Sequence, residues 1–153
     1  MSLDNIRLTQ QAKEQLIRLK RHTGLQHWNE LCRWAFCASL AEPTRPPQLR
    51  GPADSSVEMT WKVFGGAYAG AYLALLRARC ADDGLPTDEA TLAEQLRLHI
   101  HRGIGTLFSD RAARDVAALL LRAGAGDRRP HEVTPTTEAH QDVAPAHRAL
   151  DTV

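Results

Sequence analysis

The sequence contains no long apolar run, few cysteines and almost no excess charge of either sign. No stretch approaches the roughly 20 consecutive apolar residues of a membrane-spanning helix. The chain also does not open with a charged segment followed by an apolar one, as a secretion signal would. With 19 basic and 18 acidic residues, it is not a uniformly basic nucleic-acid-binding protein. We therefore expect a cytoplasmic protein in which any charged interaction surface is local.

The three cysteines, Cys32, Cys37 and Cys80, are an odd number. Cys32 and Cys37 lie five residues apart on a predicted helix, so their side chains point to different sides and cannot easily form a disulfide. We expect free thiols in a reducing compartment. Because the sequence around them shows no residue that would stabilise a thiolate, we interpret them as small core residues rather than sulfur carriers.

Signatures of catalysis and of metal or cofactor binding are also missing. The Gly65-Gly66 pair lacks the leading strand and the following Gly-Lys-Ser/Thr of a phosphate-binding loop. His99 and His101 are two residues apart, so on a helix they point about 200° apart and cannot share a metal ion. No paired-carboxylate, Ser-His-Asp or Cys-His pattern is evident. We expect no metal, no cofactor and no enzymatic activity, and we expect His99 to be a packed or hydrogen-bonded histidine.

Residues 5–40 predict a short strand followed by two helices. Ile6 and Leu8 alternate with polar residues, as in a strand. Thr9 is placed to cap a first helix and Gly24 to end it. The second helix ends before Pro43, because proline disfavours helical backbone in the residue that precedes it. Its expected inner face consists of Trp28, Leu31, Cys32, Ala35, Phe36, Ser39 and Leu40.

The remaining sequence predicts further helices. Four prolines and a glycine make residues 41–56 irregular. Residues 57–80, starting at Thr60 or an earlier serine, predict a helix that is either central or in contact with another subunit, because it has two apolar stripes. The first stripe is Phe64, Ala67, Tyr68, Ala71 and Leu75, and the second is Ala69, Leu73, Leu76 and Cys80. The helix that starts at Pro86 and Thr87 has a core stripe of Leu92, Leu96, Ile100, Gly103 and Leu107.

A last helix is expected from Ser109 to Gly124. The sequence thus predicts a mainly α protein, a compact bundle of about five helices that opens with a short strand and two helices, and we expect it to be oligomeric. We assign residues 1–124 to one helical domain. Residues 125–153 have no lasting apolar period, and we expect a disordered C-terminal tail.

The outer face of the first helix is basic. At about 100° per residue, Lys13 and Lys20 lie together, Arg21 lies to one side and Arg18 lies further round. Glu14 is the only acid among them and is spaced to pair with Arg18. This pattern is typical of a phosphate-contacting surface, and equally of an ordinary solvated helix face.

Two stretches of the sequence resemble a known family. RLTQQAKEQLIRLKRHTGL followed by NELCRWAFCASL is similar to the opening of DndE proteins, which belong to DNA phosphorothioation (sulfur modification) systems. The matching positions are Arg7-Leu8, Leu16, Leu19-Lys20, Thr23-Gly24, Leu31-Cys32-Arg33, Phe36 and Ser39-Leu40. LRLHIHRGIGTLF at 96–108 resembles a helical segment of the same family, and the likeness covers roughly residues 5–122.

The resemblance implies a mostly helical fold with a ribbon-helix-helix-like opening and a homotetramer. It also implies affinity for double-stranded DNA, notably nicked duplex, and a role in placing sulfur in the DNA backbone beside the other modification proteins. Carried onto this chain, the DNA-binding candidates are Lys13, Arg18, Lys20, Arg21 and Arg7.

Three other functions remain open. In a ribbon-helix-helix transcription regulator, strands of two subunits would pair and read bases through Asn5, Arg7 and Thr9. A subunit that assembles the modification complex without binding DNA would depend on the two-striped helix at 57–80. An enzyme, such as a nickase or a sulfur-transfer subunit, would need a metal site or an activated nucleophile, and the sequence shows neither.

Overall fold

The computed structural model describes residues 3–110, 117 and 120–121. In this part the chain is mainly helical, as predicted, and it also contains a small two-stranded sheet. The elements follow in the order β1 (Ile6–Arg7), α1 (Gln10–Thr23), α2 (Trp28–Leu40), β2 (Glu58–Met59), α3 (Trp61–Gly65), the 3-10 helix η1 (Gly66–Tyr68), α4 (Ala69–Asp82) and α5 (Glu89–Ser109).

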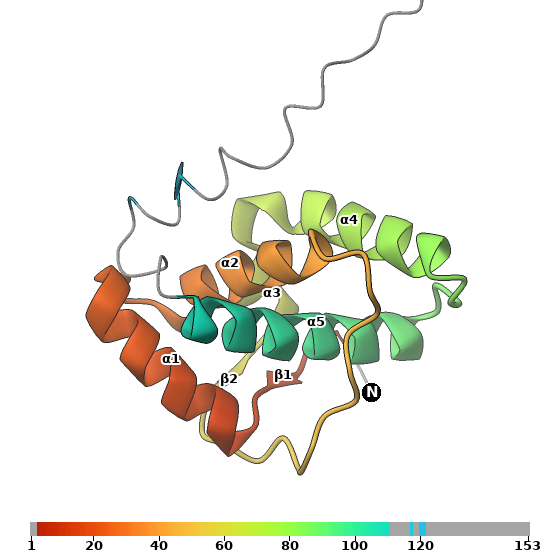
Figure 1. Ribbon diagram of the computed structural model, residues 1–153. Helices are drawn as coiled ribbons and strands as arrows, with labels where there is room; N and C mark the ends of the chain where they lie inside the picture. Colours follow the sequence, from red (N-terminus) through yellow and green to blue (C-terminus); the bar gives the residue numbers. More distant parts are fainter. Residues whose placement is uncertain (1–2, 111–116, 118–119, 122–153) are drawn as a thin grey trace, which may run out of the picture.

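The centre of the fold is the pair α2 and α5, which run side by side (Figure 1). In that view α4 lies on one side of the pair, and α1 and the small sheet lie on the other. The predicted core stripe of α5 is buried throughout. At Gly103 the two backbones nearly touch, because a Cβ atom added there would lie 1.7 Å from the carbonyl oxygen of Ala35. Glycine is thus required where α5 crosses α2.

The opening strand and its two helices form as the sequence predicts. The Thr9 hydroxyl accepts a hydrogen bond from the backbone N–H of Ala12 at 3.2 Å and caps α1. Gly24 ends α1 with a left-handed backbone, φ 76°. β1 pairs antiparallel with β2, with Ile6 opposite Met59 and Arg7 opposite Glu58. We did not predict β2, because two residues are too short to show strand periodicity.

The prediction of one helix over residues 57–80 is wrong. Thr60 does begin a helix, and its hydroxyl accepts from the N–H of Val63 at 3.2 Å, but α3 ends after one turn. Gly66 follows with a positive φ of 54° and breaks the helix. Leu76 and Cys80 of the second predicted stripe are buried. Tyr68 and Leu75 of the first predicted stripe are exposed.

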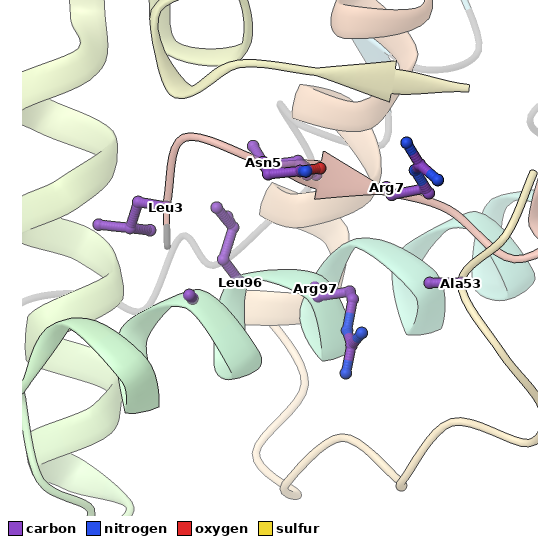
Figure 2. Close-up of a pocket in the computed structure, with 8 residues that line it drawn as sticks. Leu3, Asn5, Arg7, Ala53, Leu96 and Arg97 are labelled. Atoms are coloured by element: carbon purple, nitrogen blue, oxygen red, sulfur yellow. The ribbon is translucent and has the colours of Figure 1, made fainter. Parts of the chain in front are cut away.

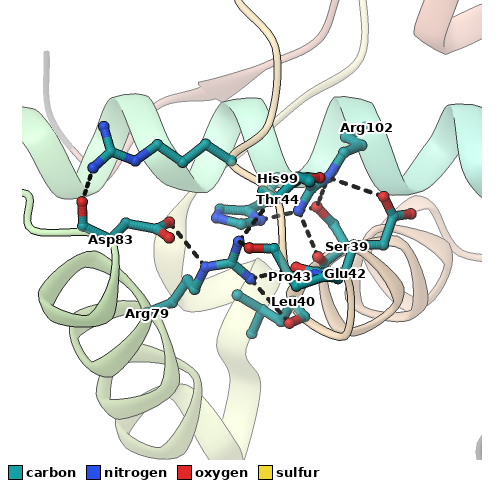
Figure 3. Close-up of polar contacts among 10 residues, drawn as sticks. Ser39, Leu40, Glu42, Pro43, Thr44, Arg79, Asp83, His99 and Arg102 are labelled. Carbon is teal, nitrogen blue, oxygen red and sulfur yellow. Dashed lines mark hydrogen bonds and ion pairs between the residues drawn. The ribbon is translucent and has the colours of Figure 1, made fainter.

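Two arginines hold the irregular 41–56 segment against the end of α2 (Figure 3). Arg79 of α4 donates to backbone carbonyl oxygens at 2.6–3.4 Å, those of Leu40, Glu42, Pro43 and Thr44. Its Nε donates to the carboxylate of Asp83 at 2.8 Å. Arg102 of α5 donates to the carbonyl oxygens of Ser39 and Thr44, both at 2.6 Å. Positive charge is favourable here, since α2 ends with free carbonyl groups.

His99 is buried next to this arginine pair and is a hydrogen-bonded histidine, as predicted. Arg102 Nε donates to Ser39 Oγ at 2.7 Å, and Ser39 Oγ lies 2.9 Å from His99 Nδ1. Ser39 Oγ thus accepts from Arg102 and also shares a hydrogen bond with His99 Nδ1, so the serine links the histidine ring to the arginine. Burial, with the charges of Arg102 and Arg79, lowers the pKa of His99 to about 4.

This lowered pKa predicts a loss of stability in acid. The unfolded chain binds a proton on His99 near pH 6.5, while the folded protein does not until about pH 4. His99 therefore stabilises the fold fully above pH 6.5, and this stabilisation falls by about 2 kcal/mol between pH 7 and pH 5. Urea unfolding of the protein and of His99→Gln across this range measures the effect. An equal pH slope for both proteins would contradict it.

The end of α5 differs from the predicted boundary. Ser109, expected to begin a last helix, is the final residue of α5, and Asp110 caps it. The rest of the helix predicted up to Gly124, and the predicted tail over 125–153, lie outside the residues that the structure describes, apart from single positions.

Candidate nucleic-acid interface

The sequence predicts a basic outer face on α1, and the structure shows where its side chains lie. Ala12, Leu16, Leu19 and Thr23 form the buried face of this helix, which turns the remaining positions outward. All four basic candidates of α1 lie on these positions. Arg18 and Arg21 are exposed, whereas Lys13 and Lys20 are half-buried at the border with neighbouring elements.

Lys13 and Lys20 lie along one edge of α1, and each has a partner there. The Lys13 ammonium donates to Ser56 Oγ at 2.8 Å, just before β2. The Lys20 ammonium lies 4.4 Å from the ring centroid of Trp28, at the start of α2. Seven residues separate the two lysines, which corresponds to about 10 Å along the helix axis. Ser56 and Trp28 therefore position the two ammonium groups, and because neither partner is charged, both lysines keep their positive charge available.

Arg18 and Arg21 lie on the other outward positions of α1. The Arg18 guanidinium lies 5.7 Å from the ring centroid of Phe108, near the end of α5. The predicted Glu14–Arg18 pair is absent from the described residues, and Glu14 instead accepts from Gln10 at 3.4 Å. Within the described part of the chain Arg21 has neither an ion pair nor a hydrogen bond to its side chain. Arg21 is therefore the most available cation of this face.

Arg7 is the one sequence-predicted DNA-binding candidate that does not lie on α1. It lies on β1 and forms an exposed ion pair with Glu58, its cross-strand neighbour on β2. Its charge is therefore balanced locally, unlike those of the α1 residues. Lys13 contacts Ser56, two residues before Glu58, so the 56–58 segment connects Arg7 to the basic face of α1.

The sequence did not indicate which other arginines hold the fold together. Arg33 donates to the carbonyl oxygens of Val63 and Phe64, and Arg79 and Arg102 hold the 41–56 segment. Each of these carbonyl acceptors lies at least 30 residues away in the sequence, so helical periodicity carries no signal for these contacts. Their guanidinium groups already have acceptors, so these three arginines are less available to a ligand than the cations of α1.

The described residues offer little for metal or thiol chemistry. They contain no group of three or more His, Cys, Asp or Glu side chains that could hold a metal ion. His101 Nε2 accepts from the N–H of Thr9 at 3.0 Å, so its Nδ1 donates to the carbonyl oxygen of Arg97 at 2.6 Å. Burial raises the pKa of Cys32 to about 12 and raises that of Cys37, which keeps both thiols protonated at neutral pH.

No helix among the described residues has the length and apolar character needed to cross a membrane. Among the sequence-predicted site residues, Lys13, Arg18, Lys20 and Arg21 lie outward on one helix, α1.

Comparisons with known proteins agree with this architecture. The family model of the DNA sulphur modification protein DndE matches residues 5–115. The crystal structure of DndE from Escherichia coli B7A, involved in DNA phosphorothioation modification, superposes with a TM-score of 0.57 at 23% identity, covering 70% of this chain and 98% of that chain. A glycine-to-lysine double mutant of DndE gives a TM-score of 0.54 at 20% identity, with 70% and 98% covered. No curated protein matches the sequence. The family model spans most of the described fold, and the chain belongs to the DndE family of DNA sulphur modification proteins.

Proposed function

We propose that this protein is a non-catalytic, DNA-binding accessory subunit of the DNA phosphorothioate modification system. It holds the phosphate backbone of duplex DNA, nicked duplex included, and it does not read bases. The observation that carries this proposal is the outer face of α1, on which Lys13, Arg18, Lys20 and Arg21 surround a single acid, Glu14. Cations placed in this way neutralise phosphates and release counterions, whatever the DNA sequence.

The pairing in the small sheet favours contact with the DNA phosphate backbone over base reading by a ribbon-helix-helix arrangement. In that alternative, β1 of two subunits would pair and enter the major groove. Here β1 pairs with β2 of the same chain, and the outward Arg7 is paired with Glu58. A side chain held by a carboxylate is poorly placed to read a base edge, whereas the α1 cations have no such acidic partner.

Charge reversal on α1 tests the proposal. We expect Lys13→Glu, Lys20→Glu and Arg21→Glu, made together, to weaken binding to a nicked duplex more than roughly tenfold at low salt, because three phosphate contacts become repulsive. A fluorescently labelled duplex gives the affinity by anisotropy.

The control is a second triple variant, Arg50→Glu, Lys62→Glu and Arg77→Glu, at exposed positions outside α1. It changes the net charge by the same amount. Equal losses for the two variants would show that only overall charge matters, and no loss for the α1 variant would contradict the proposal.

A role in assembly has a separate observation in its favour. Tyr68, at the end of η1, and Leu75 of α4 are exposed at 71% and 49%, and the exposed Ala71 and Ala74 lie between them in the sequence. Large exposed apolar side chains beside small ones are typical of a surface that another helix covers. In our proposal, this surface pairs copies of the chain into the homotetramer, or docks the other sulfur-modification proteins. The mass of the protein in solution separates these two uses.

A further inference from the structure

The start of α1 is capped by two hydrogen bonds, and the second comes from another helix. Thr9 Oγ1 accepts from the N–H of Ala12, three residues further on, as in a capping box. In a complete capping box, a Glu or Gln at that third position would also accept from the N–H of the cap residue. Ala12 has no such group, and His101 of α5 accepts instead, with its Nε2 atom 3.0 Å from the Thr9 nitrogen. One side chain of α5 thus completes the start of α1.

The His101 ring is fixed at both of its nitrogen atoms. Nδ1 lies 2.6 Å from the carbonyl oxygen of Arg97, one turn earlier on α5. Because Nε2 accepts from a backbone N–H, it carries no proton, and Nδ1 is the atom that donates. This arrangement exists only in the neutral ring, since a proton on Nε2 would remove the acceptor and direct two N–H groups at each other. The protonation state of His101 therefore determines whether the Thr9 N–H keeps its partner.

The cavity beside His101 offers nothing that would stabilise its charged form. This cavity, of about 350 Å³, reaches the ring between α1, α5 and the 41–56 segment. Two charged side chains line it, those of Arg50 and Arg102, and there is no Asp or Glu among the described residues of its lining. α1 contributes only uncharged residues to it: Thr9, Gln11, Ala12 and Gln15. A proton on His101 would therefore meet no carboxylate here.

Arg97 adds a further positive charge close to His101. It lines a second pocket, of about 510 Å³, between β1 and α5, and its side chain extends away from β1 (Figure 2). Burial lowers the pKa of His101 from its usual 6.5, and the charge of Arg97 acts in the same direction. The hydrogen bond to the Arg97 carbonyl oxygen opposes this shift only in part. At neutral pH the ring is therefore uncharged and keeps its bond to Thr9.

The turn that His101 completes carries one of the proposed DNA contacts. The N–H of Lys13 donates to the carbonyl oxygen of Thr9 at 3.1 Å, which is the first hydrogen bond of α1. The Lys13 ammonium donates in turn to Ser56 Oγ at 2.8 Å. When the Thr9 N–H loses its acceptor, this first turn is the part of α1 that frays, and Lys13 loses its fixed place. Lys20 lies about two turns further along α1 and keeps its position.

We propose that His101 is a positioning residue for DNA binding: its neutral ring holds the first turn of α1, and with it Lys13, in the place from which this lysine contacts phosphate. The inference rests on the proposed function and adds to it a residue of α5 that itself touches no DNA. It also makes DNA binding sensitive to pH, because the lysines and arginines of α1 stay charged where histidine titrates. As the pH falls, protonation of His101 releases the first turn and removes one phosphate contact.

Two substitutions of His101 test this inference. His101→Gln keeps an acceptor near the position of Nε2 and cannot be charged, whereas His101→Leu removes the acceptor. At about pH 7.5, where an ordinary histidine is neutral, we expect the unaltered protein and His101→Gln to bind a nicked duplex equally well. His101→Leu should bind roughly five- to tenfold more weakly at 0.1 M salt, with a log–log salt slope smaller in magnitude by about 0.9, the contribution of one phosphate contact. It should also speed the amide hydrogen exchange of Thr9.

His99→Leu is the matched control. Like His101, His99 is a hydrogen-bonded histidine of α5, but its partner is Ser39 of α2 and not a residue of α1. Any stability that this variant loses should leave the salt slope of DNA binding unchanged. The control thus separates the positioning of Lys13 from a general loss of stability.

A pH series gives a second result that does not depend on the folding of His101→Leu. Exposed histidines such as His22 gain charge between about pH 7.5 and pH 5 and strengthen DNA binding, but they are the same in the unaltered protein and in His101→Gln. The ratio of the two affinities therefore reports on His101 alone. We expect the unaltered protein to bind progressively more weakly than His101→Gln as the pH falls below 6.5, since the charged ring releases Thr9.

Two kinds of failure can be told apart. A ratio that stays constant over the pH series, or an unchanged salt slope for His101→Leu, overturns this inference and leaves the phosphate contacts of α1 standing. An α1 triple-glutamate variant that binds DNA as tightly as the unaltered protein contradicts the proposed function, and this inference with it.

Discussion

Replacing Gly103 with alanine should destabilise the protein by about 3 kcal/mol or more, or prevent folding altogether. The added Cβ would lie 1.7 Å from the carbonyl oxygen of Ala35 and 2.7 Å from its Cα. Both are backbone atoms in the middle of α2, so no side-chain rotation can relieve the overlap. α2 and α5 would have to separate along the most extensive contact of the fold, which removes dispersion contacts around Phe36 and Ile100.

Gly105 provides the matched control for this prediction. It lies two residues further along α5, and a Cβ added there meets no heavy atom within 4 Å. Gly105→Ala should leave stability unchanged or raise it by up to about 1 kcal/mol, because alanine favours helix over glycine. Urea unfolding of both variants gives the two free energies. A Gly103→Ala protein as stable as Gly105→Ala would show that the helices do not cross as described.

Replacing Arg79 with alanine should destabilise the protein by about 3 kcal/mol. The Arg79 side chain is only 11% exposed, and it donates both to the Asp83 carboxylate and to four carbonyl oxygens at the end of α2 and in the 41–56 segment. Its removal leaves Asp83 without its ion-pair partner and several carbonyl groups without a donor. The 41–56 segment would then lose its main attachment to α4.

Two further variants make this second prediction specific. Arg77→Ala removes the same charge from an exposed position of the same helix and should change stability by less than about 0.5 kcal/mol. Arg79→Lys keeps the charge but lacks the planar, five-donor geometry, so we expect it to lose most of what alanine loses. Thermal unfolding followed by circular dichroism gives the ranking. If Arg77→Ala and Arg79→Ala unfold together, the arginine contacts carry no net stability.

The sequence predicted those parts of the fold that depend on local signals. The apolar spacing of α1, α2 and α5, the Thr9 cap and the Gly24 stop all act within one helix, and each is confirmed. β2 escaped prediction because it depends on pairing with a distant segment, and the break at Gly66 escaped because a glycine pair does not by itself show whether a helix continues. β2 exists only as the partner of Ile6 and Arg7, and the Gly65-Gly66 pair could also occur within a continuous helix.

The candidate site was likewise predictable only where it depends on local sequence signals. Helical periodicity was sufficient to place Lys13, Arg18, Lys20 and Arg21 outside the core. It could not show that Lys20 lies on Trp28 or that Arg18 lies on Phe108, because these rings come from other helices. The pocket between β1 and α5 could not be predicted either, because it exists only once these two elements lie together.

The salt dependence of DNA binding tests the central proposal most directly. We would measure the affinity for intact and singly nicked duplexes of one sequence between 50 and 200 mM salt, conditions over which backbone contacts weaken strongly, and the mass of the assembly in the same buffer. Contacts by Lys13, Lys20 and Arg21 predict a log–log slope of about −2.7 or steeper. The proposed function also predicts tighter binding to the nicked duplex and a mass near four chains. A slope near zero, or no binding at the lowest salt, would contradict a phosphate grip by α1.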